Sequence, residues 1–394
     1  MMSKSFLDLK NGVFIYDDGS RKYTQEEVDQ LNKEHFEYQE SFIPKILEAG
    51  YIEFPVMYNG GEDNPIWSRM FLPPTFVPSN SEGFVEKYGT YSNFYIPSYG
   101  RAGIAYTNKT LDSFGIENYY FCVDPDQWES YVEAYGSKHV IVRDWTFKKG
   151  SKLYTGSGKI LPEYLNGGAG AALSVLYIAR ALGERFYWNL DDDIFSMGLK
   201  AHKGDEMFPR DAKYDKEKFY RASSIKPDSE WDMKAFIRNL EEFAIITRNH
   251  SNVTIEKFGL TFIYPIHYKT GTRAYTFYLS DTELQVDRYG RQNSDTVTSM
   301  EMNKSGLVNI LVTGYCYDTP SSQIQSGGET VIYRNFGTLD KTQILVSSAP
   351  NYSKISFVYN RIHHKINYNQ YRQMRLVGAS KEKGDKMLWK PENS

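Results

Sequence analysis

Hydrophobic and polar positions between residues 92 and 193 follow a regular strand and helix rhythm. Four apolar runs have the length of strands, and they are NFYIPS (93–98), NYYFCVD (118–124), HVIVRD (139–144) and RFYWNLDDD (185–193). The segments between these runs have helical spacing, and they are residues 101–115, 125–137 and 166–183. Strands that alternate with helices predict a parallel sheet with helices packed on its faces, so we expect an α/β fold.

The flanking regions have less regular patterns. Residues 1–90 are expected to form an N-terminal extension, with a helix over residues 24–50 that ends at Gly50 and Pro- and Gly-rich sequence after it. Beyond residue 200, the patterns predict a charged insertion, a helix at 232–249 and several Tyr-rich strands, among them residues 259–268, 273–280, 307–317 and 329–336. We therefore expect a main domain over residues 91–375 and a polar tail over residues 376–394.

Composition narrows the class of protein. Hydrophobic residues make up 41% of the chain and charged residues 24%, which is ordinary for a globular protein. The net charge of -3 gives no overall basic field, and the two cysteines argue against a disulfide framework or a cysteine zinc site. The first residues lack an apolar signal region, and no run of about 18 apolar residues occurs, so we expect an intracellular protein without a membrane partner.

Three consecutive aspartates follow the fourth apolar run. Because side chains of an extended chain alternate with period two, Asp191 and Asp193 should face one side and Asp192 the other. Two carboxylates at the end of a core strand suit Mg²⁺ or Mn²⁺ bound together with a substrate diphosphate. An Asp-rich surface turn is the simple alternative, although Ile194 and Phe195 are expected to return to the core.

Two other motifs are weaker matches. An aspartyl phosphatase would have Thr or Val where this chain has Phe195. The segment TGSGKI (155–160) lacks the glycine spacing of a P-loop and ends in Ile160 instead of Ser or Thr. Neither motif accounts for the acidic run.

Five segments, in order along the chain, resemble GT-A glycosyltransferases. The similarity is to the members associated with TET/JBP-type oxygenases in bacteriophages, which attach sugars to hydroxymethylated pyrimidines in DNA. The segments are YIPSYGRAG (95–103), FYWNLDDDI (186–194), GRQNSDTVTSMEMNKSG (290–306), QIQSGGETVIY (323–333) and RIHHKINY (361–368). The chain departs from the family in residues 167–181, where an Arg-Asn pair is common, and at Ser294-Asp295, where a double acid is common.

The resemblance implies a GT-A-like, Rossmann-like mixed sheet flanked by helices, and a metal-dependent sugar transfer. The expected donor is a nucleotide-sugar, UDP-linked, and the expected acceptor is a 5-hydroxymethylpyrimidine of phage DNA, with 5-hydroxymethylcytosine as the first choice. Mn²⁺ or Mg²⁺ is the expected cofactor, and the cytoplasm of an infected bacterial host cell is the expected location. A glycan or protein acceptor, or a non-catalytic nucleotide- or DNA-binding protein, remains an alternative.

The donor side of the site is expected at the first and fourth apolar runs. The residues assigned there are Pro97, Ser98, Arg101, Asp124, Asp191, Asp193, Gly327 and Gly328. Arg101 would hold the diphosphate or frame the base. Asp124 would bind the base or ribose, or cap the helix that begins at Pro125.

The resemblance also assigns metal, catalytic and acceptor roles. Asp191, Asp193 and His364 are the expected metal ligands, with a surface histidine pair at 363–364 as the alternative. Asp295 is the expected general base, or a helix N-cap, and Asp192 is expected to contact backbone amides or the donor sugar. Aromatic and basic side chains near a hairpin tip are the expected acceptor contacts, and they are Tyr264, His267, Lys269 and Arg273.

Overall fold

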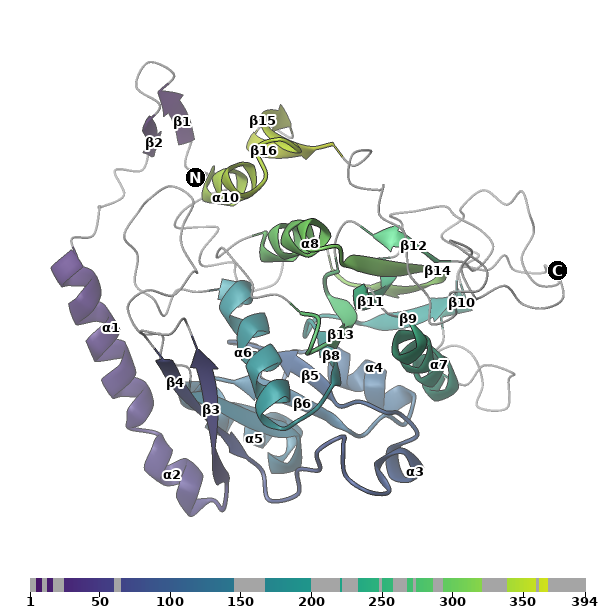
Figure 1. The fold of residues 1–394 in the computed structure, drawn as a ribbon. Helices are drawn as coiled ribbons and strands as arrows, with labels where there is room; N and C mark the ends of the chain where they lie inside the picture. The colour runs from purple at the N-terminus through teal and green to yellow at the C-terminus, as the bar shows by residue number, and fades with distance from the viewer. Residues whose placement is uncertain are drawn as a thin grey trace, which may run out of the picture.

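The structure is a computed structural model of the 394-residue chain. The described residues are 5–8, 13–16, 25–59, 65–144, 167–199, 220–221, 233–247, 250–257, 268–271, 274–285, 293–320, 339–358 and 361–367. Within them lies one twelve-stranded mixed sheet with helices on both faces (Figure 1). This architecture confirms the expected α/β class and is compatible with a GT-A-like fold.

Four parallel strands form the centre of the sheet. They are β5 (Phe94–Pro97), β6 (Tyr119–Val123), β7 (Val140–Asp144) and β8 (Phe186–Leu190). Their spatial order is β7-β6-β5-β8, so the chain moves outward from β5 to β7 and then returns to the other side of β5. The strand order therefore reverses between β5 and β8, which is the position where open α/β sheets bind ligands.

The other strands extend the sheet on both sides. On the β8 side the order continues through β13 (Phe277–Asp281), β11 (His250–Lys257), β14 (Val308–Asp318), β9 (Ser196–Leu199) and β10 (Tyr220–Arg221). Strand β12 (Tyr268–Gly271) pairs with β14 beside this path. Strand β13 is antiparallel to β8, and its register places Phe277 opposite Leu190 at the end of the strand that precedes the aspartates.

The N-terminal residues contribute to the same sheet. Strands β3 (Ile52–Asn59) and β4 (Pro65–Leu72) form a hairpin, and β4 pairs antiparallel with β7. Helices α1 (Gln25–Glu40) and α2 (Ile43–Glu48) replace the single helix expected over 24–50, and they flank this hairpin (Figure 1). The residues expected as an extension thus provide the last two strands of the sheet. The separate hairpin of β1 (Ser5–Asp8) and β2 (Val13–Tyr16) lies outside it.

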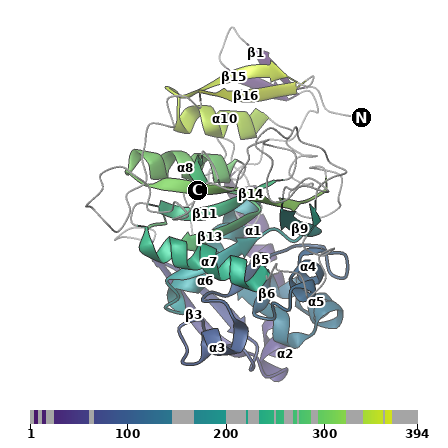
Figure 2. The same ribbon diagram turned by 90° about the vertical axis from the view of Figure 1, so that its right-hand side faces the viewer.

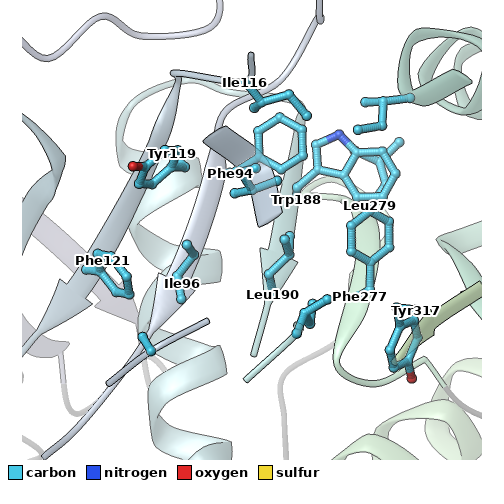
Figure 3. Packing of buried hydrophobic residues seen from close by; sticks show 14 of the residues in the cluster. Phe94, Ile96, Ile116, Tyr119, Phe121, Trp188, Leu190, Phe277, Leu279 and Tyr317 are labelled. Carbon is cyan, nitrogen blue, oxygen red and sulfur yellow. The ribbon is translucent and has the colours of Figure 1, made fainter. Parts of the chain in front are cut away.

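Alternation of side chains along the central strands creates two core layers. Phe94, Trp188 and Phe121 face the layer that contains helices α4 (Thr107–Ser113), α5 (Trp128–Tyr135) and α7 (Met233–Ile246). Figure 3 shows part of this layer, in which the rings of Phe94 and Trp188 stack at 5.7 Å. Tyr95 faces the opposite layer, which α6 (Gly167–Ala181) covers. Full burial on both faces explains why these strands read as continuous apolar runs.

Two buried glutamates connect the amino ends of the central strands to their surroundings. Glu241 of α7 accepts hydrogen bonds from the backbone N–H of Tyr91 at 2.8 Å and from the indole of Trp188 at 2.9 Å. Glu184 accepts a hydrogen bond from the hydroxyl of Tyr95 at 2.6 Å. Burial raises the pKa of Glu241 to about 7. These contacts fix the strand ends opposite to the edge at which the aspartates lie.

A smaller cluster packs above the sheet. It joins α8 (Ser294–Lys304), α10 (Leu339–Ser348) and the hairpin of β15 (Ser353–Val358) and β16 (Arg361–Ile366). Figure 2 shows these elements in sequence above β14. The short α3 (Phe84–Tyr88) and the 3-10 turns at Pro125–Gln127 and Ser137–His139 complete the described elements. Within the described chain, no helix is long and apolar enough to span a membrane.

Candidate active site

The carboxyl ends of the four parallel strands place several polar residues at one edge of the sheet. Ser98 follows β5, Asp124 follows β6, Asp144 ends β7 and Asp191 follows β8. The loop after β5 and the turn after β8 meet where the strand order reverses. We call residues Asp191–Asp193 the acidic turn, and this turn is the centre of the candidate site.

Asp192 is buried, whereas Asp191 is exposed and Asp193 is partly exposed, which is the order of burial that the alternation of side chains predicts. The Asp192 carboxylate accepts short hydrogen bonds from the Ser98 hydroxyl and from Nη1 of Arg101. The hydroxyl of Tyr131 in α5 lies 2.6 Å from Ser98 Oγ and accepts a hydrogen bond from the Arg101 backbone N–H at 3.0 Å. Asp192 therefore binds two side chains of the β5 loop, which the sequence did not suggest. A backbone hydrogen bond from its own N–H also lowers its pKa, in line with the expected amide contact, and the expected contact with the donor sugar stays a prediction.

The Arg101–Asp192 pair is buried, since the two side chains are 14% and 6% exposed. Burial alone would lower the pKa of Arg101, but the charge and hydrogen bond of Asp192, together with the charges of Asp193 and Asp191, outweigh burial and raise it. Burial raises the pKa of Asp192, and Arg101 and Ser98 oppose that shift. Arg101 is thus a charged partner inside the protein. Its guanidinium holds a carboxylate in this structure, where the sequence assigned it to the donor diphosphate or base.

Asp191 and Asp193 lie on the outer side of the acidic turn. The Thr276 hydroxyl donates a hydrogen bond to Asp191 Oδ2 at 2.8 Å, and the Asp191 backbone N–H donates to the Thr276 carbonyl at 2.7 Å. Asp193 is partly exposed and lies 3.9 Å from Nη1 of Arg101. The two outer carboxylates are the part of the turn available to a ligand, as the sequence pattern indicated.

The outer carboxylates share a negative field. Desolvation by surrounding atoms raises the pKa of Asp191, and the charges of Asp192 and Asp295 add to it, while Thr276 and Arg101 oppose it. Asp191 as a residue remains exposed, so solvent offsets part of this desolvation. Burial together with the charges of Asp191 and Asp192 raises the pKa of Asp193 to about 7. A cation at this edge would relieve the repulsion between the two groups.

Hydrogen bonds from the first turn of α4 fix the backbone of the acidic turn. The Thr107 hydroxyl donates to the Asp191 carbonyl at 2.6 Å and accepts from the Ile194 N–H at 3.0 Å. The backbone N–H of Tyr106 donates to the Asp192 carbonyl at 2.9 Å. Ile194 returns to the core as expected, but Phe195 is 37% exposed and contacts the ring of Tyr106 edge-on, so its expected burial is wrong.

Asp124 binds an arginine at the end of the neighbouring strand. Its Oδ1 lies 2.9 Å from Nε of Arg143, whose Nη1 donates to Ser174 of α6 at 2.9 Å. Asp124 occupies the expected N-cap position of the turn beginning at Pro125, but its side chain makes no capping hydrogen bond there. The contact of Asp124 with a donor base or ribose stays a prediction. Pro97, the last residue of β5, pairs with Cys122 and shapes the same edge.

Asp295 and His364 lie around the start of α8. Asp295 is in the first turn of this helix, whose N-cap position is occupied by Asn293, so the expected N-cap role of Asp295 is wrong. The charge of Asp295 is the smallest of the causes that raise or lower the pKa of Asp191, and it raises that pKa. The side-chain amide of Asn293 donates to Nδ1 of His364 at 3.2 Å.

The three expected metal ligands do not form a common cluster. Among the residues that the structure describes, no three His, Cys, Asp or Glu side chains are grouped so that they could hold a metal ion. Asp191 and Asp193 are close together, but His364 contacts Asn293 instead of joining them. The protein side chains therefore offer two carboxylates and not a three-ligand site.

Several expected residues fall outside the described part of the chain. These residues are Tyr264, His267, Arg273, Gly327 and Gly328, together with the polar tail at 376–394. Lys269 is in β12, where its backbone pairs with Leu311. The acceptor contacts and the Gly-Gly segment remain predictions.

Other residues of the site were not identified from the sequence. Thr276, Thr107 and Tyr131 make the hydrogen bonds described above, and the positive charge of Lys257, at the end of β11, lowers the pKa of Asp193. A threonine or tyrosine within an apolar segment carries no pattern that would identify its partner. Only the proximity of β11, β13 and α5 to the acidic turn reveals these roles.

Comparison with known proteins agrees with this geometry. The family model described as TET-Associated Glycosyltransferase matches residues 92–328, which is more than half of the chain. The matched region includes all four parallel strands, the acidic turn and α8. No curated protein matches the chain. The chain belongs to the TET-associated glycosyltransferase family, and it is therefore a glycosyltransferase that uses a nucleotide-sugar and an acceptor.

Proposed function

We propose that this glycosyltransferase moves a sugar from a nucleotide-sugar, UDP-linked, to a 5-hydroxymethylpyrimidine of phage DNA, with Mn²⁺ or Mg²⁺ as cofactor. The preferred acceptor base is 5-hydroxymethylcytosine, and the reaction takes place in an infected bacterial cell. The observation that carries the proposal is the acidic turn at the point where the strand order reverses, in a chain of the TET-associated family. The acceptor assignment follows from the resemblance to enzymes that modify hydroxymethylated DNA.

The donor set of the acidic turn fits a hard divalent cation. Asp191 and Asp193 present outward carboxylates whose mutual repulsion raises the pKa of Asp193. Mg²⁺ and Mn²⁺ are commonly held by one or two carboxylates together with substrate phosphates, so a complete protein cage is unnecessary. We assign Asp191 and Asp193 as the protein ligands. His364 is left out of this set because, among the described residues, it is not grouped with the two aspartates.

Each residue then has a defined task in sugar transfer. The cation supplies positive charge that stabilises the leaving diphosphate. The bond between the sugar anomeric carbon and the diphosphate oxygen breaks, and a bond from that carbon to the acceptor hydroxymethyl oxygen forms. Asp295 accepts the proton that the hydroxymethyl group loses. Its place in the first turn of α8, from which its charge reaches Asp191, supports this assignment.

Asp192 acts indirectly, through its contacts with the β5 loop. Its contacts with Arg101 and Ser98 hold the β5 loop against the acidic turn, which fixes the spacing of the donor subsite. In this proposal Asp192 is a positioning residue, because its carboxylate is buried among protein groups. Arg143 at the end of β7, paired with Asp124, provides a further charged group on the donor side.

The decisive test measures sugar transfer to DNA. Duplex DNA containing 5-hydroxymethylcytosine, 5-hydroxymethyluracil or only ordinary bases is incubated with the protein, Mn²⁺ and a panel of nucleotide-sugars, and the nucleosides are analysed by mass spectrometry. We expect a hexose or pentose mass gain on the hydroxymethylated base, abolished by chelation and by Asp191→Asn or Asp193→Asn. Asp112→Asn is the matched control, since Asp112 lies on α4, where it contacts the Tyr119 hydroxyl.

The outcomes separate the parts of the proposal. Donor hydrolysis without any mass gain on DNA would remove the DNA acceptor and favour a glycan or protein acceptor. Transfer that persists in the presence of chelator would remove the metal. Full activity of the Asp191→Asn and Asp193→Asn double variant would exclude the acidic turn as the donor site.

A further inference from the structure

We propose that Thr276 is a positioning residue that orients the Asp191 carboxylate, so that Asp191 binds the donor-bound cation through Oδ1 alone. The inference rests on the proposed function, because it assigns a geometry to one ligand of that site. Thr276 lies immediately before β13, the strand that pairs antiparallel with β8. It therefore approaches the acidic turn from a part of the chain about 85 residues away in sequence.

Two hydrogen bonds connect Thr276 to Asp191. The Thr276 hydroxyl donates to Asp191 Oδ2 at 2.8 Å, and the Thr276 carbonyl accepts from the Asp191 N–H at 2.7 Å. The second bond fixes the backbone at the base of the side chain, and the first fixes the rotation of the carboxylate. Together they leave Oδ1 as the oxygen that is not engaged by Thr276.

The backbone of Thr276 is in a conformation that its side chain disfavours. Its φ is 67°, in the left-handed region, where a β-branched residue is a genuine outlier. Such strain persists only where the surrounding structure imposes it, and it concentrates at functional sites. Asn293, with a φ of 57°, is the only other non-glycine residue with positive φ among the described residues, and asparagine tolerates that region.

The strained conformation serves the contact with Asp191. Thr276 is 9% exposed, so water cannot take the place of its hydroxyl beside Asp191 unless the surrounding residues rearrange. A glycine would adopt the same φ without steric cost, yet it would lack the hydroxyl. The choice of threonine therefore favours the orientation of Asp191 over local backbone stability.

The test compares four variants of the full-length protein. Thr276→Val removes the hydroxyl and keeps the shape, Thr276→Ser keeps the hydroxyl, and Thr276→Gly relieves the strain but loses the hydroxyl. Thr254→Val is the matched control, because the buried Thr254 hydroxyl donates to the Phe277 carbonyl at 2.6 Å, one residue from Thr276. For each variant we would measure donor hydrolysis, DNA glycosylation and thermal unfolding. Direct Mn²⁺ binding, with and without UDP, would be measured by the loss of the paramagnetic resonance signal of free Mn²⁺.

We expect Thr276→Val to lower kcat/KM for donor hydrolysis and to weaken Mn²⁺ binding by about 10-fold or more, the range for a hydrogen bond to a charged group. Thr276→Ser should recover both to within about 3-fold, and Thr254→Val should leave both unchanged. Thr276→Gly should unfold at or above the wild-type unfolding temperature, but its kcat/KM and Mn²⁺ affinity should be as low as those of Thr276→Val. Such a result would mean that Thr276 favours function at the expense of stability.

Three results would overturn the inference. The first is wild-type Mn²⁺ affinity and kcat/KM in Thr276→Val, and the second is an equal loss in Thr254→Val. The third is a wild-type protein that binds no Mn²⁺, which would remove the ligand role of Asp191. A wild-type protein that binds Mn²⁺ and hydrolyses donor but does not glycosylate DNA would refute only the acceptor assignment, and the Thr276 comparison would stand.

Discussion

The buried pair of Arg101 and Asp192 gives a quantitative test of whether Asp192 positions the site or takes part in the chemistry. Arg101→Met removes the charge and keeps much of the apolar stem, and Asp192→Asn removes the opposite charge. The double variant removes both charges. Because the two side chains are only 14% and 6% exposed, little solvent can replace the missing partner in either single variant.

The expected magnitude follows from the contacts. Removing one member of a buried ion pair destabilises a protein by about 3–5 kcal/mol, since the remaining charge is left uncompensated. In Arg101→Met, the Ser98 hydroxyl still donates to the Asp192 carboxylate, which places the expected loss near the lower end, about 3 kcal/mol. In Asp192→Asn, the amide oxygen can still accept from Ser98, but Arg101 loses its nearest carboxylate and keeps the longer contact with Asp193 at 3.9 Å.

The assay is a double-mutant cycle with urea denaturation as the readout. We expect the double variant to be less destabilised than the sum of the two single variants by about 2 kcal/mol, because the loss of both charges leaves neither group unpaired. Sugar transfer should fall moderately in Asp192→Asn, by about 10- to 100-fold. The loss arises because the β5 loop shifts, while Mn²⁺ binding by Asp191 and Asp193 stays close to wild type.

Two outcomes would contradict this reasoning. An additive cycle, with no coupling between the two positions, would show that the pair does not form in solution. Complete loss of sugar transfer in Asp192→Asn, with stability and Mn²⁺ binding unchanged, would show that the Asp192 carboxylate acts directly on the substrate.

Three further predictions concern neighbouring groups. Burial raises the pKa of Glu241 to about 7, so the protonated carboxyl contributes stability, on the order of 3 kcal/mol, that is fully present below the unfolded-state pKa and is lost as the pH rises towards 7. In urea denaturation, Glu241→Gln should lack this pH dependence, and the control Glu242→Gln should keep it. Tyr131→Phe should cost about 1 kcal/mol in urea and raise the donor KM, because Ser98 and Arg101 lose its hydroxyl. His364→Ala should leave Mn²⁺ affinity within about 2-fold, since its partner is Asn293; a larger loss would restore it as a ligand.

Local patterns account for most of the central fold. The segments expected as strands at 93–98, 118–124, 139–144 and 185–193 correspond to β5, β6, β7 and β8. Apolar runs of this kind are readable because the strands are buried on both faces. Residues 52–72 were harder to interpret, because β3 and β4 contain Pro55 and Pro65 and the Gly- and Asn-rich sequence NGGEDNP joins them.

The candidate site was predictable in position but not in partners. The acidic turn follows from three adjacent aspartates after a core strand, and period-two alternation predicts which of them turn outward. The partner of Asp192 could not be derived, because Arg101 precedes it by about 90 residues and the pairing depends on how β5 and β8 lie side by side. The same holds for Thr276, whose strand pairs antiparallel with β8.

Charge compensation explains why three adjacent aspartates can follow a buried strand. A turn with all three carboxylates facing solvent would repel itself, and a turn with all three buried would need three internal cations. Alternation separates the three carboxylates, because Asp192 is buried and pairs with Arg101, whereas Asp191 is exposed and Asp193 is partly exposed. The charges of Arg101 and Lys257 only partly offset the charge around Asp193, since the pKa of Asp193 remains raised to about 7. The turn is therefore anchored by an internal cation and left with a deficit of positive charge on its outer side, which a divalent ion arriving with the donor diphosphate would fill.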